Sequence, residues 1–132
     1  MSTRSVDAAW DGGLRCRVSA GRFELIVDEP ESVGGTDQGP QPTELLLASV
    51  ASCFTLAMAY SAGKRGVELA GLRVRATGHY DGPSFSAIRL SVQADTPDTD
   101  GLRRLVPAAE RLCYVTNTLR RSPNVTVDVG PS

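Results

Sequence analysis

One uncharged segment limits the possible folds of this chain more than any other feature. Residues 45–63 contain no Asp, Glu, Lys or Arg, no proline and few β-branched residues, a composition typical of a helix. Pro42 fits the first turn of that helix, and Glu44 lies where the positive end of the helix dipole stabilises a carboxylate. A helix that is apolar on every side must be covered on every side. We therefore expect it to be central, with a second subunit covering what a small sheet leaves open.

The same segment is long enough to be tested as a membrane span. Several serines and a threonine interrupt it, and the flanking segments have the pattern of soluble β structure. We expect a buried core helix and no membrane contact. The N-terminus, MSTRSVDAAWDGG, lacks the apolar run of a signal peptide, which predicts a cytoplasmic protein.

Alternating apolar and polar residues predict two β-hairpins. The first pairs residues 14–19 with 23–27, and the second pairs 72–80 with 85–94 across a turn at 81–83. We expect both hairpins to pack on the central helix. Between the first hairpin and that helix, Gly, Pro, Asp and Ser predict a long irregular surface loop.

The C-terminal third is predicted to hold two further helices and a strand. Asp98 and Thr99 can cap a helix that runs to Cys113, with Pro107 expected to kink or interrupt it. A short helix follows at 115–121, and the alternation of NVTVDV predicts a last strand at 124–129. With 132 residues and 14.0 kDa, the chain is predicted to be a single α+β domain over 1–132.

Charge and composition exclude several classes of function. The chain carries 14 Lys and Arg against 15 Asp and Glu, so no positive field favours nucleic acid. A single histidine, His79, cannot build a multi-histidine metal site, and no glycine-rich phosphate loop is present. We therefore expect no nucleic-acid partner, no metal and no cofactor.

The three cysteines are the candidates for chemistry. Their odd number and wide spacing argue against a disulfide framework or a zinc site. Cys16 lies on the apolar side of a strand, which favours packing. Cys53 lies inside the apolar helix, where packing and reactivity are both open and the helix dipole is too far away to lower its pKa. Cys113 is expected near the N-terminus of the next helix, a position that suits thiol exchange.

Glu44 and Cys53 are poorly placed to cooperate on one straight helix. Nine residues turn the side chain by about 180° and rise about 13 Å. A joint role would need a bend or another chain.

Two long segments carry a resemblance to a known family: GGTDQGPQPTELLLASVASCFTLAMA (34–59) and AERLCYVTNTLRRSPNVTVDV (109–129). The opening W-x-GG-x-R run, the VDEP of residues 27–30 and the Gly-Pro-x-Pro-x-Glu-Leu helix start belong to the same pattern. Together they resemble the OsmC/Ohr family of osmotically inducible and organic hydroperoxide resistance proteins. The similarity spans nearly the whole chain.

The resemblance implies a fold and an activity. It implies an intertwined α+β homodimer with active sites at the subunit interface. It also implies a thiol peroxidase in which Cys53 is the peroxidatic cysteine and Cys113 the resolving one, with an organic hydroperoxide as substrate and an external dithiol, lipoyl-type or other, as reductant. The apolar surroundings of Cys53 favour an alkyl hydroperoxide over hydrogen peroxide.

In the peroxidase branch of the family an arginine stabilises the thiolate and a glutamate orients the arginine. Arg15 is the candidate for the first role, with Arg17 and Arg22 as alternatives. Glu44 is the candidate for the second role, although the branch has its carboxylate one position earlier, where this chain has Thr43.

Two other classes of function remain open from the sequence. One is a non-enzymatic module that binds a small lipophilic ligand in an apolar pocket, with packing cysteines of ordinary pKa. The other is a stoichiometric redox sensor that forms the same disulfide and is recycled slowly or not at all.

Overall fold

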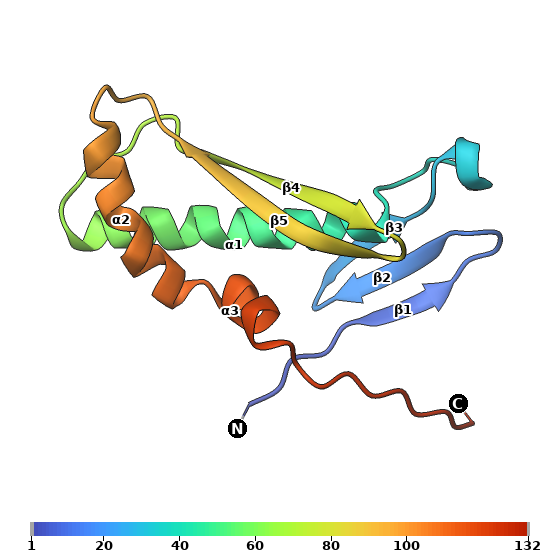
Figure 1. The fold of residues 1–132 in the computed structure, drawn as a ribbon. Helices are drawn as coiled ribbons and strands as arrows, with labels where there is room; N and C mark the ends of the chain where they lie inside the picture. The colour runs from blue at the N-terminus through green and yellow to red at the C-terminus, as the bar shows by residue number, and fades with distance from the viewer. Residues whose placement is uncertain (1, 132) are drawn as a thin grey trace. The chain divides into compact units, whose positions relative to one another are not determined.

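The fold is of mixed α+β class, as the sequence predicts. A computed structural model describes residues 2–131 and contains two small antiparallel sheets and three α-helices (Figure 1). The chain divides into two compact units, one that ends at Leu46 and one that begins at Leu47. Each unit is described by itself.

The N-terminal unit is built on a three-stranded sheet in the order β1-β2-β3. β2 (Cys16–Ala20) and β3 (Phe23–Val27) form the predicted hairpin. β1 (Asp7–Trp10) was not predicted, and it pairs antiparallel with the other edge of β2. Its four exposed residues, DAAW, carry no alternation of their own, so the pairing with β2 is what makes them a strand.

The loop after β3 is irregular apart from one 3-10 turn, η1 (Glu31–Val33). Two glycines allow its backbone to fold closely on itself. A Cβ atom at Gly35 would lie 1.9 Å from the carbonyl oxygen of Glu29, and one at Gly39 would lie 2.0 Å from that of Ile26. The long surface connection predicted here is therefore confirmed, and it is tightly folded.

The long helix α1 (Pro42–Lys64) begins in the first unit and runs into the second. By length and composition alone, α1 is long and apolar enough to cross a membrane, a test that the core helix of a soluble protein also passes. One face of α1 packs into the core of the second unit, including Val50, Phe54 and Met58. Leu56 and Tyr60 are 70% and 56% exposed, so this chain alone covers only part of the helix.

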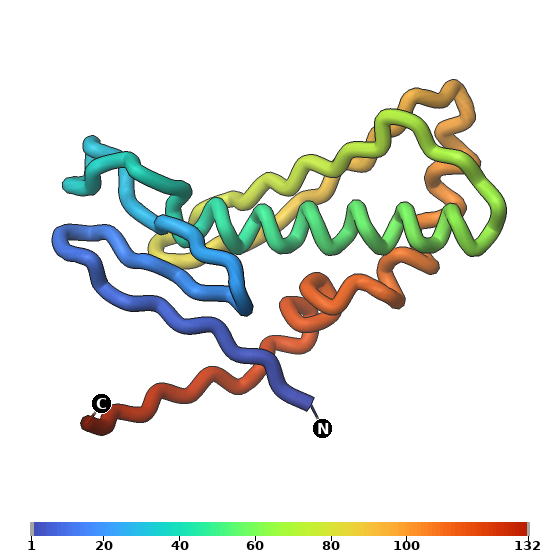
Figure 2. Tube along the Cα trace, turned by 180° about the vertical axis from the view of Figure 1, so that it is seen from behind, coloured from blue at the N-terminus to red at the C-terminus, as the bar shows by residue number. Residues whose placement is uncertain are grey.

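The second unit combines α1 with a hairpin and two short helices. β4 (Arg73–Asp81) and β5 (Ser84–Gln93) pair as predicted, and both run along α1 (Figures 1 and 2). α2 (Thr99–Leu112) and α3 (Tyr114–Arg121) follow. The helices share one hydrophobic core cluster: Phe54, Ala57, Met58, Ala62, Leu102, Leu105, Ala109 and Cys113. Val74, Leu90 and Val92 of the hairpin pack against it.

The predicted interruption at Pro107 was wrong. α2 is capped by Asp98, whose Oδ1 accepts a hydrogen bond from the Gly101 N–H at 2.8 Å, and it continues unbroken through Pro107 to Leu112. A proline costs one backbone hydrogen bond, and the buried residues on both sides of it, among them Leu105 and Ala108, hold the helix in place. The chain changes direction at Cys113 instead, which is extended between α2 and α3.

The predicted strand at 124–129 is also wrong for the described chain. These residues form no regular structure, and Val125, Val127 and Val129 are 82%, 86% and 97% exposed. A strand requires a neighbour for its N–H and C=O groups, and no strand pairs with this segment within residues 2–131.

Candidate thiol site

The two predicted redox cysteines come together in the second unit. Cys113 is fully buried in the core cluster, and the half-buried Cys53 of α1 packs against that cluster. The two thiols are close enough to influence each other's ionisation. Helix α1 supplies one thiol and the junction between α2 and α3 supplies the other.

The start of α3 organises this pair. Cys113 is the N-cap residue of α3, with φ −81° and ψ 98°. Its carbonyl accepts hydrogen bonds from the Asn117 N–H at 3.0 Å and the Thr116 hydroxyl at 3.3 Å. Cys113 therefore lies at the positive end of the helix, a position that favours a thiolate.

The pKa values of the two thiols move in opposite directions. Burial raises the pKa of Cys53, and the contact with Cys113 raises it further, against the lowering effect of the Val115 and Tyr114 N–H groups. Burial also acts to raise the pKa of Cys113, but the Thr116 hydroxyl and N–H, the Cys53 thiol and the Val115 N–H together bring it below its ordinary value.

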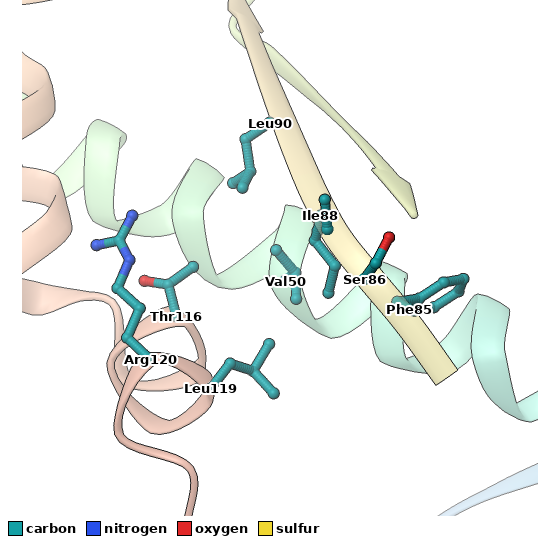
Figure 3. A pocket seen from close by; sticks show the side chains of 9 residues that line it. Val50, Phe85, Ser86, Ile88, Leu90, Thr116, Leu119 and Arg120 are labelled. Atoms are coloured by element: carbon teal, nitrogen blue, oxygen red, sulfur yellow. The ribbon is translucent and has the colours of Figure 1, made fainter. Parts of the chain in front are cut away.

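An apolar cavity of about 420 Å³ lies between α1, β5 and α3 of the same unit (Figure 3). Its lining includes Val50, Phe85 and Ile88, with Arg120 on the α3 side. Neither cysteine lines it. Thr116 does, and the same residue acts on Cys113, so the cavity reaches the residue that stabilises the thiol.

The three candidate arginines lie in the N-terminal unit. Arg15 is half-buried; its Nε donates to Asp11 Oδ2 at 3.2 Å and its Nη1 to Thr36 Oγ1 at 3.3 Å. Arg17 pairs with Glu24 at 2.8 Å. Arg22 lies over the ring of the neighbouring phenylalanine. Their roles toward Cys53 stay predictions.

Glu44 has a structural partner at the start of α1. Its Oε1 accepts a hydrogen bond from the Gln41 N–H at 2.9 Å, the reciprocal part of a capping box. The expectation that Glu44 lies in the first turn of the helix is confirmed. Its catalytic role stays a prediction.

Two groups of contacts were missed from the sequence. In the N-terminal unit the buried carboxylate of Asp28 accepts hydrogen bonds from the Thr36 hydroxyl at 2.5 Å and from three backbone N–H groups of its own loop. In the second unit Thr116 was missed beside Cys113. No capping-box pattern marks Thr116 in the sequence, because that pattern has Glu or Gln three residues after the N-cap.

Comparison with known proteins gives one family. The model of the family described as OsmC-like protein matches residues 35–128. An uncharacterised protein of Haloferax volcanii is 28% identical over 134 residues, which cover 98% of this chain and 96% of that protein.

Two solved structures show the fold. An organic hydroperoxide resistance protein from Elizabethkingia anophelis is 22% identical with a TM-score of 0.68, covering 89% of each chain. A proposed organic hydroperoxide resistance protein from Vibrio cholerae, with captopril in one of its active sites, is 27% identical with a TM-score of 0.65, covering 92% of this chain and 89% of the other.

Proposed function

This chain belongs to the OsmC-like protein family, and from that premise we propose that it is a cytoplasmic thiol peroxidase that reduces organic hydroperoxides to alcohols. The observation that carries the proposal is the contact between Cys53 and Cys113. Two thiols that are sixty positions apart in the sequence meet at the start of one helix. Such a pair can be oxidised to a disulfide and reduced again.

The proposed reaction uses both cysteines. The Cys53 thiolate attacks the distal oxygen of the hydroperoxide, the O–O bond breaks, and the alkoxide takes a proton and leaves as an alcohol. Cys113 then attacks the sulfur of the Cys53 sulfenic acid. This step forms the disulfide and releases water. An external dithiol supplies two electrons and two protons and returns the pair to thiols. Cys53 takes the first step because it is the more exposed of the two residues.

The substrate class follows from the cavity beside α3. Its apolar lining can bury an alkyl or aryl tail, a gain of about 0.8 kcal/mol for each buried methylene. Hydrogen peroxide has no such tail. An organic hydroperoxide is therefore the preferred substrate in this proposal.

A homodimer is part of the proposal. Leu56 and Tyr60 expose an apolar face of α1, and the valines of the C-terminal segment alternate along an unpaired backbone. Both features favour a second copy of the chain as the partner. The variant Leu56→Asp is expected to shift the protein to monomer in light scattering, whereas Arg104→Asp, an exposed position on α2, should remain a dimer. An unchanged mass for Leu56→Asp would contradict this face as the interface.

In the proposed site a cation balances the Cys53 thiolate. Arg15 is the first choice, since Asp11 and Thr36 hold its guanidinium in one orientation. Glu44 is the proposed carboxylate that would orient this arginine.

The proposal is tested by oxidation of the reduced protein with one equivalent of cumene hydroperoxide. Free thiols and intact mass are measured for wild type, for Cys53→Ser and, as the matched control, for Cys16→Ser. Wild type and the control should rapidly lose the two thiols of the pair and yield a disulfide between residues 53 and 113, and Cys53→Ser should not. A wild-type protein whose thiols do not react would overturn the proposal.

One observation favours a second candidate function. The cavity is not lined by either cysteine, so it can also serve a module that binds a lipophilic ligand without redox chemistry. Saturable binding of an apolar fluorescent probe by a protein with peroxide-inert thiols would favour that function.

A further inference from the structure

A small cavity lies between the end of α1 and the last turns of α2, and the proposed reaction does not use it. Its volume is about 160 Å³, which is below the roughly 300 Å³ at which pockets for drug-sized ligands begin. Neither Cys53 nor Cys113 lines it. The cavity therefore has room for one small group and not for a long apolar tail.

Three cations border this cavity, and no carboxylate of the described chain does. Lys64, Arg65 and Arg111 all line it, and none of them forms an ion pair with a described Asp or Glu. Glu110, the acid next to Arg111 in the sequence, pairs instead with Arg120 at 3.0 Å. Because like charges repel one another, an anion with more than one charge would stabilise this arrangement.

The hydroxyl of Ser61 is a second and independent sign of a ligand. Ser61 lines the cavity and is 1% exposed, and its Oγ has no hydrogen-bond partner among the described residues. A helical hydroxyl is commonly satisfied by the carbonyl one turn earlier, as Thr55 of the same helix is by Ala51 at 2.7 Å. A buried hydroxyl is costly to leave without a partner, and an acceptor oxygen bound in the cavity would supply one.

The cations are positioned around this hydroxyl. Arg65 Nη1 donates to the Ser61 carbonyl at 3.3 Å, and a guanidinium has further N–H donors for an oxyanion. Lys64 Nζ lies 5.7 Å from the centre of the Tyr60 ring, which also lines the cavity. Arg111 comes from the last turn of α2. Attraction to the C-terminal ends of two helices explains each cation singly, but not their meeting beside an unpartnered hydroxyl.

We propose that this cavity binds a phosphate group, which Lys64, Arg65 and Arg111 hold while the Ser61 hydroxyl donates to one of its oxygens. Guanidinium groups match phosphate oxygens in pairs, and lysine adds a point charge. Several cations favour a phosphate dianion over a carboxylate, which has a single charge. Tyr60 also belongs to the exposed face that we propose for the homodimer, so the cavity borders that face, but all of its lining comes from one chain.

The site is tested by isothermal titration calorimetry of the reduced full chain with inorganic phosphate, at an ionic strength held constant with sodium chloride. Wild type should bind one phosphate per chain. Arg111→Gln should weaken binding by about tenfold or more, because a hydrogen bond to a charged group is lost.

Arg103→Gln is the matched control. It removes the same charge from the same helix, at a position where the arginine pairs with Asp100 at 2.7 Å on the surface, and its affinity should equal that of wild type. A wild-type protein without saturable binding, or equal weakening in the two variants, would overturn the proposal.

Ser61→Ala separates binding from packing. Without phosphate, this variant should unfold at the same temperature as wild type or at a higher one, because it removes a buried hydroxyl that has no partner. Its affinity for phosphate should nevertheless fall by about threefold to tenfold. An affinity equal to that of wild type would contradict the proposed contact of Ser61 with the ligand.

The same titration with glycerol 3-phosphate distinguishes two sources of the phosphate group. Tighter binding of this ester than of inorganic phosphate would assign the cavity to a phosphorylated small molecule, and tighter binding of inorganic phosphate would assign it to the free ion. Both results support the site. Binding of neither compound would overturn it, whatever the reactivity of the two cysteines.

Discussion

The loop around Asp28 and the thiol pair around Cys113 are built in the same way in two different units. In each, a threonine hydroxyl and backbone N–H groups that follow in the sequence act to lower the pKa of a buried acidic group, with Thr36 beside Asp28 and Thr116 beside Cys113. The Thr36 hydroxyl is the main cause that lowers the pKa of Asp28 to about 2, against the raising effect of burial. In both places short-range donors favour the ionised form of a buried group.

The difference between the two sites lies in the second group. All partners of Asp28 are hydrogen-bond donors of its own loop, so its carboxylate stays in one state at ordinary pH. Cys113 instead contacts Cys53, which is ionisable, half-exposed and able to form a covalent bond with it. The comparison teaches that the same construction gives a fixed structural anion in one unit and a changeable pair in the other, depending on what touches the anion.

The largest effect is expected from removing the Cys53 thiol. Under the proposed function, Cys53→Ser should reduce turnover of cumene hydroperoxide with an external dithiol to the uncatalysed background, because no sulfur remains to attack the peroxide. Turnover is measured as peroxide consumed. Cys16→Ser, a thiol of β2, is the control that should keep full activity. Activity in Cys53→Ser would break the comparison, since Cys113 would then react alone.

A second effect concerns the fixed anion. The pKa of Asp28 is lower in the folded chain than the ordinary value of about 4, so its contribution to stability is present above about pH 4 and is lost as the pH falls toward about 2. Thr36→Val removes the main donor and should raise the pKa of Asp28. The acid unfolding midpoint, followed by Trp10 fluorescence, should therefore move to higher pH.

Thr77→Val is the matched control for this prediction. Thr77 is exposed on β4, so the same change of side chain should leave the acid midpoint where it is. Equal shifts in both variants would mean that the Asp28 contact adds nothing of its own, and this half of the comparison would fail.

The elements that the sequence predicted correctly are those defined by local patterns. Residues 45–63 could hardly be anything but helix, and both hairpins show alternation around clear turn residues. The two strand errors have one physical origin, which is that a strand depends on its neighbour. DAAW at Asp7–Trp10 has a weak pattern and is a strand because β2 lies beside it. NVTVDV at 124–129 has a strong pattern and no strand beside it in the described chain.

The site was predictable in its residue types and not in its contacts. A cysteine inside an apolar helix and another before a short helix could be selected from the sequence, together with the position of Cys113 near a helix start. The contact between Cys53 and Cys113 depends on how α2 and α3 return along α1. Pro107 pointed to a break in α2, whereas the chain turns at Cys113 itself. The roles of Thr36 and Thr116 depend on these same local backbone paths.

The smallest effect, and the sharpest test of the comparison, is expected from Thr116→Val. This change removes the hydroxyl that lowers the pKa of Cys113 and preserves the size of the side chain. The pKa of Cys113 should rise, so less Cys113 thiolate is present at neutral pH, and the step in which Cys113 attacks the Cys53 sulfenic acid should slow by about threefold to tenfold. Thr118→Val is the matched control, because the Thr118 hydroxyl donates to the Tyr114 carbonyl at 2.7 Å on the exposed side of the same helix. Single-turnover rates of disulfide formation, measured against pH, should have their midpoint at a higher pH in Thr116→Val and an unchanged midpoint in Thr118→Val. If the two variants behave alike, the threonine beside Cys113 does not act as Thr36 does beside Asp28, and the start of α3 must stabilise the anion through its backbone alone.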